Sequence, residues 1–341
     1  MAFMTIRERF LDCLIGSDVD KIPVCSVTQT GTVELMEATG SYWPEAHYNP
    51  EKMATLAIGA HKIVGLEGVR YPFDGTDIGQ ALGCEIKNGT LDSQPSIYKS
   101  PCQTKEDALN FSISENILDS ERLSTLLDAT KIIRGRVGED VPIIAGMVGP
   151  AAIATCIVGV TNYLMWCITN PEIIKHLLKI GTDICIDYSN ALFEHGADAI
   201  CIPDSESGPD LLPPSCFETL FLPLYKKISS NTTGPMILHM CGDATDILDS
   251  MAITGFEGLS IEEKVNTKYA NDVIGKRACL IGNVAPVDIL LSSQPSDVIK
   301  DAQRCMDDGV NILAPGCGLA PHTPTKNLKA LVYARNEYYK N

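Results

Sequence analysis

The chain has 341 residues, of which 45% are hydrophobic and 21% charged, so it can bury a large core. Its formal net charge of −16 disfavours nucleic acid and anionic membranes as partners, because both attract Lys and Arg. The 13 cysteines show no CxxC spacing and the N-terminal residues lack a signal-peptide pattern, so we expect a cytoplasmic protein whose cysteines are mostly small buried apolar residues.

The order of the predicted elements indicates an α/β barrel. Helical spacing predicts a first helix over residues 5–15, as an N-terminal extension. Eight apolar runs follow, mostly separated by helical patterns, and the predicted strands are residues 21–29, 68–74, 141–149, 197–204, 235–243, 256–263, 278–286 and 309–318. Eight such strands favour a closed (β/α)8 barrel, with an open doubly wound sheet as the alternative. No repeat or linker divides residues 1–341, which we interpret as one domain.

Two segments between these strands need separate interpretation. The long connection over residues 75–140 contains an Asn-Gly turn, which predicts a small antiparallel excursion after the second strand. Residues 141–171 carry no charge and are long enough to cross a bilayer. Because Gly149 and Pro150 split this run, a buried strand followed by a core helix explains it better than a membrane span.

Polar residues gather where the predicted strands end. The active sites of such barrels lie at the carboxyl ends of the strands. Here those ends carry Gln29, Asp74, Asp204, His239, Cys241, Glu262, Glu263, Asn283 and Cys317. These side chains are therefore the candidate catalytic, metal-binding and substrate-binding residues.

His239 and Cys241 are the strongest candidates for metal ligands. Residues two apart on a strand share one face, and imidazole and thiolate are preferred zinc ligands. Cys317, at the end of the eighth strand, could complete a set of three, which is typical of a catalytic zinc with an open fourth position. Glu263 or Glu262 could fill that position at rest. The competing interpretation is that these cysteines are only buried core residues.

The remaining polar residues allow a functional and a structural interpretation. Gln29, Asp74, Asp204 and Asn283 could bind substrate. The two aspartates could equally cap the helix or loop that follows them, and Asn283 could simply satisfy backbone groups. His322 follows Cys317 by five residues and is an alternative ligand.

The sequence resembles the uroporphyrinogen decarboxylase superfamily over nearly its whole length. The similar stretches include "RERFLDCLIGSDVDKIPV", "LHMCGDATDIL" and "GVNILAPGCGLAPHTPTKNLKALVYA". Within that superfamily it looks most like the methylcobamide:coenzyme M methyltransferases of methanogenic archaea, on "IPVCSVTQTGTVELME" and "GFEGLSIEEKV". The resemblance implies a (β/α)8 fold and a zinc site of His239, Cys241 and Cys317. It also implies methyl transfer from a methylcobamide, carried by a separate corrinoid protein, to the thiol of coenzyme M in methanogenesis.

Other functions remain as alternatives. A metal-free decarboxylase acting on a tetrapyrrole would need arginines near the first strand end, and residues 24–36 contain none. A corrinoid methyltransferase with another acceptor and a non-catalytic corrinoid-binding protein are the other possibilities.

Overall fold

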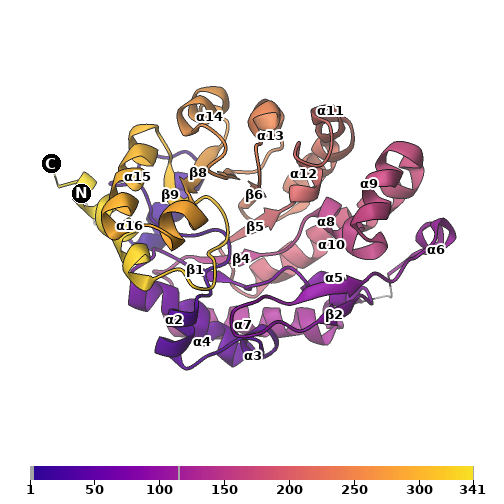
Figure 1. Ribbon diagram of the computed structural model, residues 1–341, viewed down its shortest axis with the longest axis horizontal. Coiled ribbons are helices and arrows are strands. Elements are labelled where there is room, and N and C mark those ends of the chain that lie inside the picture. The colour runs from indigo at the N-terminus through magenta and orange to yellow at the C-terminus, as the bar shows by residue number, and fades with distance from the viewer. Residues whose placement is uncertain (1–3, 114–115, 341) are drawn as a thin grey trace.

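A curled parallel sheet forms the centre of the molecule. The computed structural model describes residues 4–113 and 116–340. Seven strands lie in the order β1-β4-β5-β6-β7-β8-β9, all parallel to their neighbours, and Figure 1 shows helices around them. Their bounds are Val69–Tyr71 (β1), Ile143–Gly146 (β4), Ala199–Pro203 (β5), Met236–Met240 (β6), Gly258–Ile261 (β7), Cys279–Val284 (β8) and Ile312–Pro315 (β9).

The segment around Val24 closes the sheet into a barrel. Val24 forms a parallel bridge with Leu313 of β9. The amide of Cys25 donates to the Leu313 carbonyl at 3.1 Å, and the amide of Glu67, just before β1, donates to the Val24 carbonyl at 2.7 Å. The barrel is therefore confirmed, although the strand expected over residues 21–29 is reduced to this single bridge.

The outer layer consists of helices of uneven length. The first half of the chain contains α1 (Ile6–Leu14), α2 (Val33–Thr39), α3 (Glu45–Tyr48), α4 (Pro50–Gly59), α5 (Asp77–Ala81), α6 (Lys105–Asn110), α7 (Glu121–Val137), α8 (Pro150–Val158) and α9 (Val160–Thr169). The second half contains α10 (Pro171–Glu194), α11 (Pro214–Cys216), α12 (Leu222–Asn231), α13 (Leu248–Met251), α14 (Thr267–Ile274), α15 (Pro295–Asp307) and α16 (Thr325–Tyr338).

Small apolar side chains fill the inside of the barrel. This inner cluster comprises Phe10, Cys13, Leu14, Cys25, Val27, Ile144, Ala199, Cys201, Ile237, Cys279, Ile281, Ile312 and Ala314. Because Phe10, Cys13 and Leu14 belong to α1, that helix packs against the barrel interior. The alternation along the strands then fixes which later residues also face inward.

Two expectations for the segments between strands have different outcomes. The antiparallel excursion is confirmed, as β2 (Glu85–Lys87) pairs with β3 (Ser96–Lys99). The single core helix expected after Pro150 is instead two, α8 and α9, which meet at 109°. Gly159 lies between them with φ of 78°, a conformation that favours glycine. Among the described residues no single helix is long and apolar enough to cross a membrane, although this bent pair passes by length and composition.

A buried carboxylate connects both ends of the described chain to the closing segment. Glu67 accepts from Arg335 of α16 at 2.6 and 2.9 Å and from Arg9 of α1 at 3.2 Å. The amide of Val24 lies 3.3 Å from Glu67 Oε2. Both arginines are almost fully buried. Glu67 is the carboxylate that compensates Arg335, and it shares the compensation of Arg9 with Asp20, which lies 2.6 and 3.0 Å from the Arg9 guanidinium.

Candidate metal centre

His239 and Cys241 lie together at the carboxyl end of β6. Ile237 belongs to the inner cluster, and His239, two residues later, faces the same side. The imidazole is 1% exposed; its Nδ1 lies 3.0 Å from Ser260 Oγ and its Nε2 lies 3.1 Å from Cys241 Sγ. Ser260 is the direct partner of His239 on β7 and therefore holds the ring so that Nε2 faces Cys241.

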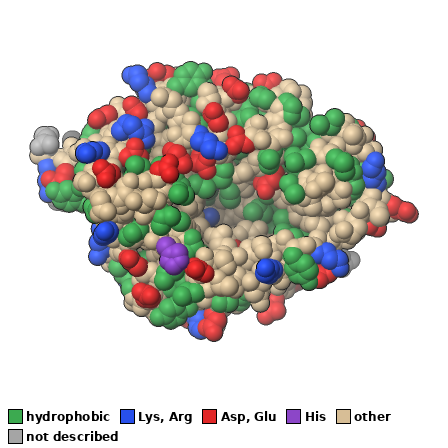
Figure 2. Space-filling model, in the orientation of Figure 1, with side chains coloured by type: hydrophobic (Ala, Val, Ile, Leu, Met, Phe, Trp, Pro, Cys, Tyr) green, Lys and Arg blue, Asp and Glu red, His purple; other side chains and the backbone are tan. Residues whose placement is uncertain are grey.

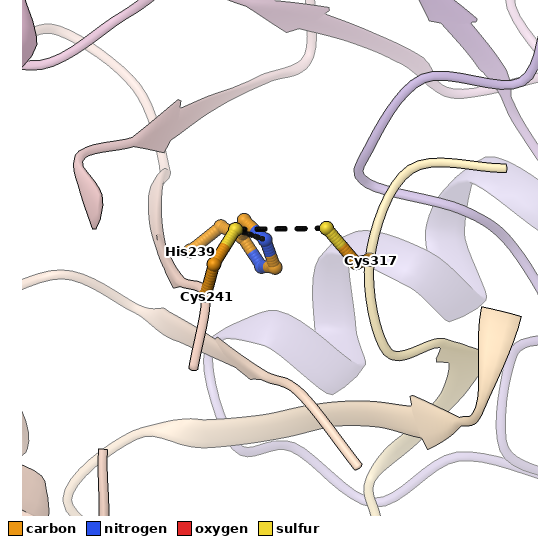
Figure 3. Close-up of side chains that lie close together, drawn as sticks. All are labelled: His239, Cys241 and Cys317. Atoms are coloured by element: carbon orange, nitrogen blue, oxygen red, sulfur yellow. Dashed lines mark hydrogen bonds between the residues drawn. The ribbon is translucent and has the colours of Figure 1, made fainter. Parts of the chain in front are cut away.

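Cys317 approaches from the loop after β9. Its Sγ lies 3.5 Å from Cys241 Sγ, across 76 positions of sequence. Figure 3 shows His239 and Cys241 on one side and Cys317 entering from a separate loop on the other. Together they form the one group of three or more metal-ligating side chains found among the described residues, with ligand atoms within 4.8 Å of one another.

The two thiols differ in their tendency to ionise. A hydrogen bond from Cys317 lowers the pKa of Cys241 to about 3, and His239 acts in the same direction. Partial burial of Cys241 acts to raise the pKa but is outweighed. The same contact with Cys241, followed by burial, raises the pKa of Cys317. Of the two thiols, Cys241 is therefore the one that ionises more readily.

The donor set fits zinc. One imidazole nitrogen and two sulfurs at bond lengths of about 2.0–2.3 Å would lie roughly 3.5–3.8 Å apart in a tetrahedral site. The observed separations of 3.1 and 3.5 Å are close to these values, so a small outward movement of the side chains would admit the ion. The three residues leave a tetrahedral ion one position for another ligand.

A small pocket opens beside these three residues. Its volume is about 160 Å³. It is lined by Thr28, Gln29, Arg70, Pro72, Phe73, Asp74, Gly75, Gln94, Gly146, Met147, Val148, Pro203, His239, Cys241, Cys317 and Gly318. Figure 2 shows a hollow over the central strands of Figure 1, with acidic side chains along one side. The pocket suits a molecule of a few heavy atoms.

The structure brings two of the four expected substrate-binding residues to this pocket. Gln29 and Asp74 line it. Asp204 does not, because its carboxylate accepts from the amides of Ala151 and Ala152 at the start of α8 and from the Tyr225 hydroxyl. Asp204 therefore caps a helix, but the helix is α8, which precedes it in the chain, and not the element that follows it as the structural alternative expected.

Asn283 is also placed away from the pocket. Its amide nitrogen donates to the carbonyls of Glu262 and Val265, and its oxygen accepts from the Thr267 hydroxyl at 2.7 Å. With its amide engaged in these contacts, Asn283 fixes the loop after β7.

The three other candidate metal ligands lie outside the group. Glu263 is exposed, and its carboxylate is not among the ligand atoms within 4.8 Å of one another. Glu262 Oε2 accepts from the Gly242 amide at 2.8 Å, which braces the turn after Cys241. His322 is exposed and lies 3.3 Å from Asp92. The structure therefore brings together His239, Cys241 and Cys317 but not these alternatives.

Sequence reasoning missed a buried charge cluster next to the pocket, formed by His47, Asp74, Asp77 and Arg122. Asp74 Oδ2 lies 2.7 Å from both Arg122 Nη2 and His47 Nδ1. Burial acts to raise the pKa of Asp74, but His47 and Arg122 outweigh it and the pKa is lowered. No local pattern could reveal this cluster, because its members are joined only by the fold.

Asp77 yields a test of this cluster. It is fully buried, and within the described part of the chain neither carboxylate oxygen has a hydrogen-bond partner. Burial and then the charge of Asp74 raise the pKa of Asp77 to about 7. Because the folded-state pKa exceeds the unfolded one, the contribution of Asp77 to stability is present at low pH and is lost as pH rises from about 4 to 7. Asp77→Asn should therefore raise the free energy of unfolding by about 1–3 kcal/mol at pH 8 and by less at pH 5.

Urea denaturation at both pH values measures this difference. The exposed Asp187→Asn on α10 is the matched control and should change stability by less than about 0.5 kcal/mol at either pH. An equal effect of Asp77→Asn at pH 5 and pH 8 would contradict the raised pKa.

Known proteins are similar to this chain over nearly its whole length. The uroporphyrinogen decarboxylase (URO-D) family matches residues 5–338. The methylcobamide:CoM methyltransferase MtaA of Methanosarcina barkeri is 45% identical over 99% of this chain and 100% of its own length. MtbA of Methanosarcina acetivorans, also a methylcobamide:CoM methyltransferase, is 38% identical over 99% of each chain. A solved methyltransferase from Methanosarcina mazei superposes with a TM-score of 0.96 at 44% identity, covering 99% of this chain and 100% of that one.

Proposed function

This chain belongs to the uroporphyrinogen decarboxylase family, and we propose that within it the protein transfers a methyl group from a methylated corrinoid to the thiol of coenzyme M, using a zinc ion. The observation that carries the proposal is the convergence of His239 Nε2, Cys241 Sγ and Cys317 Sγ beside a pocket of about 160 Å³. Full-length similarity to two named methylcobamide:CoM methyltransferases supports the choice of substrates.

His239, Cys241 and Cys317 are the residues that would hold zinc. When bound there, zinc would ionise a thiol at neutral pH, whereas a free thiol with a pKa of about 8.5 is mostly protonated. Two thiolates and a neutral imidazole cancel the charge of a divalent ion, so the incoming sulfur keeps its electron density. Replacing either cysteine by histidine would remove that balance.

In the proposed reaction the sulfur of coenzyme M attacks the methyl carbon of the corrinoid. A carbon–sulfur bond forms while the carbon–cobalt bond breaks, and its electron pair stays on cobalt. The products are methyl-coenzyme M and a Co(I) corrinoid, and the thiol proton is released. The chain contributes position: Ser260 orients His239, and the two cysteines come from separate loops.

The surroundings of the pocket leave room for the corrinoid. A second hollow of about 390 Å³ shares Gly75 and Val148 with the pocket and extends past Ser100 to Val160 of α9. We propose that a separate corrinoid protein presents its cofactor over this opening.

The decarboxylase alternative fits the pocket poorly. A tetrapyrrole is far larger than a cavity of about 160 Å³, and its several carboxylates call for several cations. Of the residues that line the pocket, Arg70 is the one lysine or arginine.

Incubating the purified protein with methylcobalamin and coenzyme M tests the proposal. We expect the absorbance of methylcobalamin to fall as Co(I) forms, with methyl-coenzyme M as the second product and one zinc per chain by elemental analysis. Thiol substrates other than coenzyme M, and tetrahydrofolate, separate this activity from transfer to another acceptor. Metal-free protein with full activity would exclude the zinc mechanism.

Ser260→Ala should weaken the proposed metal site without destroying it. Groups that orient a ligating imidazole typically change metal affinity by about 10–100-fold. We expect a loss of that size in a zinc competition titration against a chromophoric chelator. Ser207, a buried serine that contacts Asp204 and Tyr225, gives the control Ser207→Ala, which should keep the wild-type zinc affinity. Equal zinc affinity in wild type and Ser260→Ala would contradict the role of Ser260.

A further inference from the structure

Arg70 is a buried cation that faces the same pocket as the metal centre. It is the middle residue of β1, and its register partner on β4 is Ile144, a member of the inner cluster. Its side chain therefore points into the barrel, where it lines the pocket with His239, Cys241 and Cys317. The residue is 6% exposed.

The fold holds the guanidinium in one orientation. Nε donates to the Val27 carbonyl at 2.6 Å, and Nη1 donates to the Pro72 carbonyl at 2.8 Å. Gly146 on β4 provides the space, because a Cβ at that position would overlap the guanidinium. Nη2 is left with no protein acceptor among the described residues, so this end of the group is available to a ligand.

The charge of Arg70 has no carboxylate partner among the residues that the structure describes. No ion pair formed within residues 4–113 and 116–340 includes it, in contrast to Arg9, Arg122 and Arg335. Burial lowers the pKa of Arg70, yet arginine stays charged at neutral pH. Asp74 lines the same pocket, but Arg122 and His47 already compensate its carboxylate. A buried cation without a partner lowers the stability of the fold unless a bound anion compensates its charge.

We infer that Arg70 binds the anionic end of the thiol substrate and makes the enzyme selective for short thiols that carry a sulfonate. This inference rests on the proposed function, because it assigns the second end of a molecule whose sulfur lies at the metal centre. Nη2 carries two N–H groups, and these can donate charge-assisted hydrogen bonds to sulfonate oxygens. The small pocket suits a substrate in which only a few bonds separate sulfur from charge.

Comparing an anionic with a neutral thiol tests the assignment. Coenzyme M and 2-mercaptoethanol have the same carbon chain and differ in the sulfonate. With methylcobalamin as donor, Arg70→Gln should raise the KM for coenzyme M by about 10–100-fold, the loss expected for a charge-assisted hydrogen bond. Turnover with 2-mercaptoethanol and zinc content should change by less than about threefold.

Two further variants separate charge from position. Arg70→Lys keeps the charge without the planar fork and should give a smaller rise in KM. Gly146→Ala keeps the arginine but displaces its guanidinium, and should raise the KM for coenzyme M with little effect on 2-mercaptoethanol. If Arg70→Gln does not fold, these two variants still decide the question.

Binding of ethanesulfonate provides a readout that does not depend on activity. Ethanesulfonate carries the sulfonate but no thiol. It should compete with coenzyme M in calorimetric titrations of wild type and fail to compete in Arg70→Gln. Unchanged discrimination between the two thiols in Arg70→Gln would overturn the assignment. If wild type transfers methyl to neither thiol, the proposed function fails, while loss of ethanesulfonate binding in Arg70→Gln still supports Arg70 as the anion site.

Discussion

Cys317→Ala should lose the metal and more than about 100-fold of methyl-transfer activity while the barrel stays folded. Cys317 is only half buried and lies in a loop after β9, so its removal leaves the apolar core intact. Without its sulfur, His239 and Cys241 offer two ligands to an ion that prefers four. A thiol of pKa about 8.5 is then ionised to only a few per cent at pH 7, and it also loses its fixed position. Elemental analysis, circular dichroism and the methylcobalamin assay measure the three quantities.

The chain offers a matched control for this substitution. Cys216 at the end of α11 is also partly buried and lies outside the metal centre, so Cys216→Ala should keep zinc and activity. Cys241→Ala should behave as Cys317→Ala does. Stoichiometric zinc in either site variant would contradict the proposed ligand set.

Glu67→Ala should lower the free energy of unfolding by about 3–5 kcal/mol, because it leaves the buried Arg335 without its carboxylate and Arg9 with Asp20 alone. That is a large part of the 5–15 kcal/mol typical of a domain. The substitution should also weaken the closure of the barrel, because Glu67 contacts the Val24 amide. Urea denaturation followed by circular dichroism gives the measurement.

Glu51→Ala is the control for the Glu67 prediction. Glu51 pairs with Arg136 at the surface, where its side chain is 61% exposed, so the cost should be below about 1 kcal/mol. If Glu67→Ala does not fold, Glu67→Gln, which keeps the shape and part of the hydrogen bonding, should be less destabilised and measurable. A loss below 1 kcal/mol for Glu67→Ala would show that the two arginines are stabilised without it.

Much of the fold could be read from the sequence, because parallel strands buried on both faces appear as continuous apolar runs. Seven predicted runs contain strands of the sheet. The run at 21–29 pairs only at Val24, and the helix after Pro150 breaks at Gly159. Both differences arise from tertiary packing and backbone geometry, which apolar periodicity does not report.

The part of the candidate site that could be predicted is the part that depends only on where residues stand along the strands. His239 and Cys241 share a face of β6, and strand order carries Cys317 to the same mouth. The partners of these residues were not predicted, because Ser260 meets His239 through strand register and His47 meets Asp74 from a helix far away in sequence. For Asn283 the sequence left open whether it binds a ligand or satisfies backbone groups, and the structure shows contacts of the second kind, because a strand-end position does not say which groups a side chain meets.

The bridge between Val24 and Leu313 has a consequence for how the protein is made. Closure joins a segment near the start of the chain to β9, and Cys317 follows β9 directly. The chain must therefore be synthesised past Leu313 before the barrel can close, and past Cys317 before the third sulfur can reach the other two ligands. Before that point the growing chain can supply only His239 and Cys241, so the complete centre assembles together with barrel closure and is not a nucleus around which folding begins.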